Sequence, residues 1–475
     1  MTVDWANLAA SVDLHLDVDG TAGRRNGLER ALREAIRAGR LAPGTRLPAS
    51  RALAAEIGLA RNTVAAAYDQ LTAEGYLQAR IGSGTFVIGT PALDSRSRAP
   101  ATAPVQFMDT PPVRYDLRPG KPDVTTFPVA LWLRAVRRAL NEAPASVFDY
   151  AEPRGTVELR TQIAEYLGRA RGVYAHPDRI VITSGCVQAL SILTIALGRP
   201  AIGMEEPGLP DHRGVIRQAG GTVLPVPVDA RGARIEAIPE PARAVVLTAA
   251  HQYPIGVTLH PSRRQAAIEW ARSGRDRIVV EDDYDGEFRF DRQPVGALQG
   301  TAPDHVVYIG TASKTLAPAV RLAWMVVPDR LVGPLNEAKR FADRQTDTIS
   351  QLALADLIAS HDYDRHVRAS RLRYRQRRDM LVERLGGRLR LDGIAAGLHA
   401  LIRLPDDGPT EQQVLAKAAE VGLGVGDLTS HWHNADDAGA PPAHREQGLI
   451  VGYGTPGTSA YPAALDLLAR VLRTV

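Results

Sequence analysis

The chain has 475 residues, of which 45% are apolar and 23% charged, and this composition excludes a disordered or collagen-like protein. At about 150 residues per domain the length allows roughly two to four domains, while the net charge of +4 indicates no class of partner. The lone cysteine, Cys186, excludes an internal disulfide and a multi-cysteine metal site, so no metal is expected. Acidic residues near the N-terminus argue against a signal peptide, and no apolar run approaches the ~18 residues of a membrane helix. We therefore expect a cytoplasmic protein without a membrane segment.

Three regions differ in composition. Between residues 24 and 80 there are ten arginines against five acidic residues. Residues 90–113 contain five prolines, which block helix formation and predict an extended linker. From residue 114 onward, β-branched runs alternate with helical patterns. We expect a small head domain at 1–89, a Pro-rich linker at 90–113 and an α/β body at 114–475.

The head is predicted to contain three short helices and a hairpin. Apolar residues at helical spacing predict a first helix over 27–38, and Ser50 is expected to cap a second helix that ends at Gly58. A third helix starts at Arg61 after a tight turn, which is the helix-turn-helix arrangement. The segment GYLQARIGSGTFVI then predicts two strands around a Gly-Ser-Gly turn, a wing.

The start of the third helix in such a head lies against DNA bases. Arg61, Asn62 and Thr63 occupy that position, and Arg and Asn carry the forked hydrogen-bonding groups that base edges need. Arg80 on the wing and Arg51 on the second helix complete the predicted contacts to a double-stranded operator. The alternative is a three-helix packing unit with solvated arginines and no DNA. The stretch LPASRALAAEIGLARNTVAAAYDQLTAEGYLQARIGSGTFV resembles the winged helix-turn-helix of GntR-type bacterial regulators along its whole length.

Only four of the 57 basic residues are lysines: Lys121, Lys314, Lys339 and Lys417. Lys314 alone lies between two buried, strand-like runs, where burial lowers the pKa of an ammonium and suits imine formation with an aldehyde. Lys121 lies in a Pro-rich turn, and Lys339 and Lys417 lie on polar helical stretches where we expect solvated side chains. Seven residues after Lys314, Arg321 offers a planar fork that suits a phosphate.

Two further segments of the body carry suitable groups. Asp282 and Asp283 directly follow a buried strand, where a carboxylate can hold a pyridine nitrogen protonated, and Tyr284 can hydrogen-bond a ring hydroxyl. In RIVITSGCVQAL, a Ser184-Gly185 turn between strand and helix points backbone N–H groups at an anion. Each feature alone is common in proteins without a cofactor.

In combination they have the order found in fold-type-I pyridoxal-phosphate (PLP) enzymes. YAEPRGTVELRTQIAEYL, ITSGCVQAL, EEPG, HQYPIGVTL, EDDYDGEF and SKTLAPAVR resemble that family, in family order, across about 360 residues. With the GntR-type head, the chain resembles the MocR/GabR family of bacterial regulators. The resemblance implies an α+β winged helix-turn-helix head. It also implies an α/β fold-type-I transferase body with a mostly parallel sheet and a smaller C-terminal α/β subdomain.

The resemblance also implies a cofactor site and a homodimer. PLP would form an internal aldimine with Lys314, with Asp282 at the pyridine nitrogen and Tyr284 near the ring hydroxyl. Tyr150 resembles the tyrosine that reaches the neighbouring subunit's phosphate, and Tyr253 replaces an asparagine that aminotransferases carry before proline. Cys186 could have a lowered pKa at a helix start, although a small, partly buried filler is the favoured interpretation. Phosphate contacts are implied for Ser184, Gly185, Cys186, Thr311, Ser313 and Arg321, with Gln188 nearby.

Departures from the family pattern concern the ligand. Leu209 stands where an aromatic residue is common, and Asp211 stands where the GABA-responsive branch has arginine. The nearest candidates for binding an effector are Arg213 and Arg445. Without an arginine that binds the ligand carboxylate through two hydrogen bonds, the affinity for an amino acid is lower. This argues against efficient transamination and against GABA as the effector.

Three functional hypotheses remain. The first is a transcription regulator that senses PLP, an amine or an amino acid, and controls vitamin B6 or amine metabolism. The alternative is an active aminotransferase with a fused DNA-binding head. A third is a body that binds no cofactor.

Overall fold

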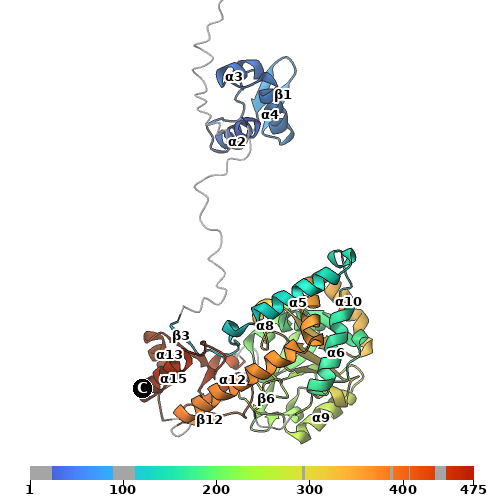
Figure 1. Ribbon diagram of the computed structural model, residues 1–475, viewed down its shortest axis with the longest axis vertical. Coiled ribbons are helices and arrows are strands. Elements are labelled where there is room, and N and C mark those ends of the chain that lie inside the picture. The colour runs from blue at the N-terminus through green and yellow to red at the C-terminus, as the bar shows by residue number, and fades with distance from the viewer. Residues whose placement is uncertain are drawn as a thin grey trace, which may run out of the picture. The chain divides into compact units, whose positions relative to one another are not determined.

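The computed structural model divides into two compact units, residues 1–110 and 111–475, and each is described by itself (Figure 1). The predicted linker, except for Val113, and the candidate effector residue Arg445 lie outside the described residues. None of the described helices is long and apolar enough to cross a membrane. The structure describes residues 24–88, 113–290, 295–385, 389–405, 407–433 and 446–474.

The head is a winged helix-turn-helix, as predicted. Its elements are α2 (Arg24–Arg37), α3 (Ser50–Glu56), α4 (Arg61–Ala73), β1 (Leu77–Arg80) and β2 (Gly84–Val87). Leu32, Val64 and Leu71 are fully buried between the helices, and the two strands pair antiparallel as the wing. The expected cap at Ser50 is wrong, because Ala49 is the N-cap residue of α3 and no side chain caps this helix.

The body is built on an eight-stranded sheet with the order β4-β11-β10-β9-β8-β5-β6-β7. Neighbouring pairs from β10 to β6 are parallel, whereas β11 runs antiparallel to both β10 and β4. Strand β4 therefore runs in the same direction as β10, and the carboxyl ends of β4, β10, β9, β8 and β5 share one edge. The strands are β4 (Ile180–Thr183), β5 (Ala201–Glu206), β6 (Thr222–Asp229), β7 (Gly232–Ala233), β8 (Ala242–Leu247), β9 (Ile278–Asp282), β10 (Val306–Thr311) and β11 (Ala323–Val326).

Helices cover both faces of this sheet. Val181 of β4 points to one face, and its neighbours Ile180 and Ile182 point to the other, as alternation along a strand requires. The first face packs against α7 (Cys186–Ala196), α8 (Pro210–Gln218) and α10 (Asp329–Ala342). The second face packs against α5 (Val129–Glu142), α6 (Val157–Arg171), α9 (Pro261–Arg272) and α11 (Thr348–Ala359).

The C-terminal part of the body is the predicted smaller subdomain. It is an antiparallel sheet in the order β12-β13-β16-β15, formed by β12 (Arg390–Asp392), β13 (His399–Arg403), β15 (Gly426–Asp427) and β16 (Gly448–Gly452). Helices α13 (Glu411–Glu420) and α15 (Tyr461–Thr474) accompany it, and the long α12 (Asp362–Leu385) packs against both α11 and α15 (Figure 1). β3 (Tyr115–Asp116) pairs with β14 (Leu423–Gly424).

Candidate functional site

The shared edge of the large sheet brings the predicted cofactor residues together. Asp282 is the last residue of β9, Thr311 is the last residue of β10, and Ser184 directly follows β4. The candidate ligand atoms of Cys186, His212 and Asp282 all lie within 4.8 Å of one another. Residues far apart in the sequence are therefore neighbours because parallel strands end side by side.

The two adjacent aspartates have different environments. Asp283 is buried and accepts hydrogen bonds from Arg171 Nε (2.6 Å), Arg171 Nη2 (3.0 Å) and Tyr308 Oη (2.8 Å), so its charge is compensated. Asp282 points to the opposite side and has no arginine partner within the described chain. Burial, with Asp283 adding to it, raises the pKa of Asp282 to about 7. A buried carboxyl group of this kind gains from a cationic or N–H partner, which makes Asp282 the one available to a ligand.

Lys314 lies beside Asp282 in the turn after β10. Its ammonium donates to the carbonyl oxygen of Gly120 at 2.6 Å. Burial lowers the pKa of Lys314, and the negative charges of Asp282 and Asp285 oppose this effect. The side chain is thus partly withdrawn from water, as the sequence predicted, and a lowered pKa increases the fraction of nucleophilic amine.

The other three lysines divide differently from the expectation. Lys121 and Lys417 are solvated, with side chains 56% and 45% exposed. The expectation for Lys339 is wrong, because this side chain is 0% exposed. A polar helical pattern did not reveal that its acceptors come from outside the helix.

Gly185, Arg321 and the first N–H groups of α7 form a candidate anion site, which we call the anion cup. Gly185, the N-cap residue, has φ of +142°, and a Cβ there would lie 3.2 Å from both terminal nitrogens of Arg321. Arg321 itself has φ of +53°, and its guanidinium has no hydrogen-bond or ion-pair partner within the described chain. The first N–H groups of a helix and an unpaired guanidinium together favour an anion such as a phosphate. Thr311 and Ser313 lie in the adjoining turn, where Thr311 Oγ1 accepts from the backbone N–H of Ser313 at 3.1 Å.

Tyr284 belongs to a cluster of buried and half-buried aromatic rings. Its hydroxyl lies 3.1 Å from Nδ1 of His251, and the same nitrogen lies 2.8 Å from Oδ2 of Asp285. Tyr253 contacts Tyr284 edge to face at 6.1 Å between centroids and lies 4.9 Å from the His399 ring. Burial raises the pKa of Tyr284 well above its usual range, and Asp285 adds to it, so the hydroxyl keeps its proton and can donate a hydrogen bond.

His212 is a site residue that the sequence did not identify. It lies in the first turn of α8, beyond the end of β5, with Nδ1 3.7 Å from Oδ2 of Asp282. Burial lowers the pKa of His212 to about 4, and Lys314 contributes, so the ring is neutral at neutral pH. The position of His212 soon after the Glu-Pro-Gly motif was the signal in the sequence that could have identified it.

Cys186 is half-buried at the start of α7. Burial raises the pKa of its thiol well above the usual range, with Asp282 adding to the shift, so the thiol is protonated at neutral pH. This agrees with the favoured interpretation of Cys186 as a filler rather than a reactive thiolate.

Two predicted ligand residues lie in unexpected surroundings. Arg213 is 5% exposed, and its guanidinium donates to the carbonyl oxygens of Gly208 (2.9 Å), His431 (3.0 Å) and Trp432 (3.2 Å). A ligand carboxylate would compete with these carbonyls, so the role of Arg213 stays a prediction. Tyr150 is 76% exposed, and the Arg344 guanidinium lies 4.8 Å from its ring centroid.

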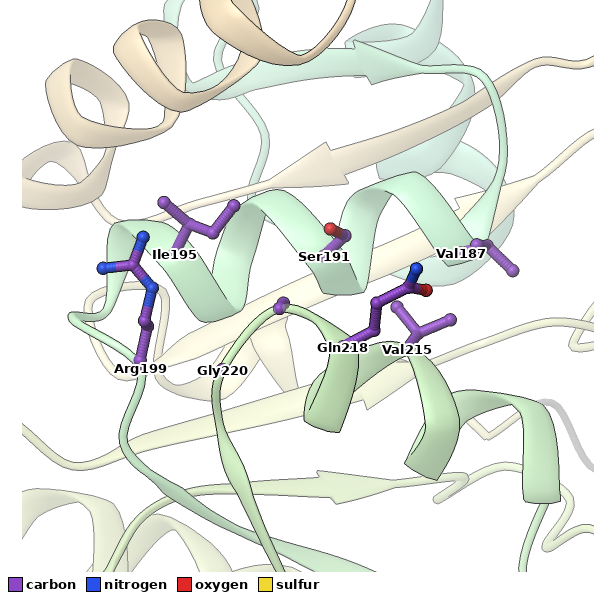
Figure 2. Close-up of a pocket in the computed structure, with 8 residues that line it drawn as sticks. Val187, Ser191, Ile195, Arg199, Val215, Gln218 and Gly220 are labelled. Carbon is purple, nitrogen blue, oxygen red and sulfur yellow. The ribbon is translucent and has the colours of Figure 1, made fainter.

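A groove of about 560 Å³ lies between α7 and α8 (Figure 2). None of the predicted site residues lines this groove, which is therefore separate from the site formed by Ser184, Asp282 and Thr311 at the strand ends. Its lining residues are Val187, Ser191 and Ile195 of α7, Val215 and Gln218 of α8, and Arg199, Ala219 and Gly220.

The head presents its predicted DNA contacts to solvent. Arg51, Arg61, Asn62 and Arg80 are exposed, and Thr63 is half-buried at the start of α4. Arg51 and Arg61 form no ion pair with any described residue, whereas Arg33 on α2 is paired with Glu74. The Arg80 guanidinium lies 4.9 Å from the Phe86 ring centroid, which holds it against the wing. Unpaired arginines at the start of a helix in this fold are suited to DNA.

Comparison with known proteins agrees with this architecture. Residues 24–87 match the family "Bacterial regulatory proteins, gntR family", and residues 120–415 match "Aminotransferase class I and II". The pyridoxine biosynthesis transcriptional regulator PdxR of Corynebacterium glutamicum is 32% identical over 90% of this chain and 91% of its own length. The rhizopine catabolism regulatory protein MocR of Rhizobium meliloti is 32% identical over 93% and 92%. TauR of Rhodobacter capsulatus is 30% identical over 96% and 97%.

Solved structures reproduce the body. Pyrococcus horikoshii kynurenine aminotransferase superposes with a TM-score of 0.68 at 22% identity, covering 77% of this chain and 92% of that chain. At this identity the likeness shows the fold alone. The family matches and the full-length relatives together show more: the chain belongs to the MocR/GabR family of bacterial transcription regulators, in which a GntR-type winged helix-turn-helix head is joined to an aminotransferase-like body.

Proposed function

We propose that this regulator binds a double-stranded DNA operator through its head and PLP through its body, and that PLP changes the affinity for DNA. The observation that carries the proposal is the anion cup, in which the start of α7 and the unpaired Arg321 guanidinium lie at the same sheet edge as Lys314 and Asp282. PLP has one group for each of these: a phosphate for the start of α7 and Arg321, an aldehyde for Lys314, and a basic ring nitrogen for Asp282.

Named residues would hold each part of the cofactor. Arg321, Gly185 and Cys186, with Ser184, Thr311 and Ser313, would bind the phosphate. Lys314 supplies the amine for the aldehyde, and Asp282 would keep the ring nitrogen protonated. Tyr284 and Tyr253 lie on the side of the ring hydroxyl in this proposal. When bound, PLP supplies an electron-withdrawing ring that stabilises negative charge on an attached amine.

The sensed molecule is proposed to be PLP itself, alone or with a small amine. One full-length relative is named for pyridoxine biosynthesis, and this name supports a link to vitamin B6. Arg213, one of two candidate carboxylate ligands, is held by four backbone carbonyls, which argues against strong binding of an amino acid. Another relative is named for rhizopine catabolism, so effectors other than PLP are also to be tested.

A second copy of the chain is proposed to cover one exposed aromatic face. Phe148, Tyr150 and Phe341 are 66%, 76% and 73% exposed, which is unusual for a surface in water. They lie on neighbouring segments, because Arg344 contacts Tyr150 and Gln345 Oε1 accepts from the N–H of Ala151 at 2.6 Å. We define this aromatic face by Phe148, Tyr150 and Phe341. A homodimer through it would place Tyr150 at the partner subunit's phosphate.

An active aminotransferase is the second candidate, because the fold and the Lys314–Asp282 pair also suit that activity. Incubation of the PLP-loaded protein with a panel of amino acids separates the two. Keto acid in molar excess over protein would indicate an enzyme, and at most one equivalent would indicate a regulator.

The regulator proposal is tested by DNA binding. Fluorescence anisotropy of DNA from upstream of the chain's own gene should show an affinity that changes across a PLP titration. An affinity that is the same at all PLP concentrations would contradict the sensing proposal. Binding should also weaken steeply with added salt, since arginine–phosphate contacts release counterions.

A further inference from the structure

An ion pair with a buried cation lies beside the turn that precedes α7. Lys339 of α10, although 0% exposed, has a complete set of acceptors. Its ammonium donates to both carboxylate oxygens of Asp343 (2.9 Å each) and to Thr346 Oγ1 (2.9 Å), and it lies 3.4 Å from Gln188 Oε1. Burial lowers the pKa of Lys339, and Asp343 opposes this effect. Burying a charge costs free energy unless the charge is fully paired, so the buried ammonium of Lys339 depends on all of these acceptors being in place.

The cluster is connected to the cup by Gln188. The side-chain amide of Gln188 donates to Asp343 Oδ2 at 2.7 Å, while its Oε1 accepts from the backbone N–H of Ser184 at 2.9 Å. On the other side, Thr346 Oγ1 donates to the carbonyl oxygen of Ile182 in β4 at 3.3 Å. The ion pair therefore holds the end of β4, the Ser184 turn and the first turn of α7 in one arrangement.

This arrangement also determines which N–H groups can reach an anion. The N–H of Ser184 is engaged by Gln188 and is not directed into the cup. The N–H groups that remain for an anion follow Gly185, at the start of α7, next to Arg321. Binding through backbone N–H groups depends on their being fixed in advance, because reorientation costs free energy when the ligand arrives.

We propose that Lys339, acting through Asp343 and Gln188, is a positioning residue that fixes the Ser184–Cys186 turn for the phosphate of the cofactor. The inference rests on the proposed PLP site and adds a residue to it. Lys339 touches no cofactor atom in this proposal. Its effect is specific to the phosphate and leaves the amine of Lys314 and the carboxyl group of Asp282 in place.

The test compares a phosphorylated with an unphosphorylated ligand. Apoprotein of the full chain is titrated with PLP and with pyridoxal, which lacks the phosphate, and binding is followed by visible absorbance. In Lys339→Met the dissociation constant should rise by about tenfold for PLP and by less than about twofold for pyridoxal. A tenfold rise corresponds to the loss of one hydrogen bond that involves a charged group. Lys417→Met, which removes an exposed lysine, should change neither constant.

A second variant guards against misfolding. Lys339→Met leaves Asp343 without its cation, whereas Lys339→Met/Asp343→Leu removes both charges and avoids an unpaired one. The double variant should show the same loss for PLP over pyridoxal, because the Gln188 amide then lacks its acceptor, Asp343. If both variants bind PLP as the wild type does, or lose PLP and pyridoxal equally, the positioning role is wrong. In that case Lys314→Ala still tests the cofactor proposal, since it should abolish the absorbance band of the imine with either ligand.

Discussion

The guanidinium of Arg321 lies against Gly185, so closely that a Cβ on the glycine would be 3.2 Å from both of its terminal nitrogens. One residue is the N-cap of α7 and the other has a left-handed backbone before β11. The contact puts the cation at the positive end of a helix, where an anion between them is the natural partner.

This contact leads to a prediction for Gly185→Ala. The methyl group would displace Arg321 and would strain a backbone with φ of +142°, so the affinity for PLP should fall by about tenfold. Gly198→Ala is the matched control, because Gly198 also has positive φ (+79°) near the other end of α7 but has open space at its Cβ position. It should lower thermal stability without changing the PLP dissociation constant. Equal PLP affinity in the two variants would contradict a phosphate site at Gly185 and Arg321.

Arg61→Ala should separate DNA binding from cofactor binding. Arg61 is exposed at the start of α4 without an ion-pair partner in the described chain, so its loss should weaken operator binding by about tenfold or more. The slope of log affinity against log salt should fall by about one if Arg61 contacts a phosphate. Arg30→Ala removes an exposed arginine of α2 and should leave operator affinity nearly unchanged. The absorbance of bound PLP should be the same in both variants.

His212 predicts an acid-sensitive stability in the apoprotein. Its pKa is about 4 when folded, below its ordinary value of 6.5. Between these pH values the unfolded chain binds a proton at His212 that the folded chain does not, so the contribution of His212 to the free energy of unfolding falls as pH decreases from 6.5 to 4. The contribution is about 3 kcal/mol over this window.

Denaturant unfolding of the apoprotein at pH 4 to 7 measures this effect. His212→Gln should lose less stability than the wild type as the pH falls. His176→Gln, which replaces a histidine with a 66% exposed side chain, should follow the wild type. A His212→Gln curve parallel to the wild-type curve would show that the ring is not held neutral.

Phe341→Asp should weaken self-association. A carboxylate in the centre of a covered apolar face would lose its water, which costs several kcal/mol unless it is paired. Sedimentation velocity should show a dimer for the wild type and a larger monomer fraction for the variant. Tyr174→Asp changes another aromatic residue, 65% exposed and outside the aromatic face, and should remain dimeric. A wild-type monomer at all concentrations would contradict the proposed dimer.

The elements and the fold were predictable because local patterns were long and regular. The head's helices and wing follow from helical spacing and the Gly-Ser-Gly turn, and the body's strands from β-branched runs bounded by turns. Lys314 could be selected by its position between two such runs. Ser50 failed as a cap because α3 begins one residue earlier than its side chain could serve.

Contacts between distant segments were not predictable. Lys339 looked solvated because its helix is polar, yet one of its neighbours, Gln188, lies 151 positions away in the sequence. His212 reaches Asp282 only because β5 and β9 end at the same sheet edge. Likewise, nothing local distinguishes Asp282 from Asp283. Their roles separate in the fold, where Arg171 and Tyr308 compensate only the second.

PLP held by Lys314 is proposed to control DNA binding. The most direct measurement is the anisotropy of labelled upstream DNA across a PLP titration, with wild-type protein and Lys314→Ala in parallel. We predict that the wild-type affinity changes with PLP, and that Lys314→Ala shows neither this change nor the absorbance band of the imine. A wild-type DNA affinity that does not change with PLP, or a Lys314→Ala protein that responds to PLP as the wild type does, would contradict control of DNA binding by PLP on Lys314.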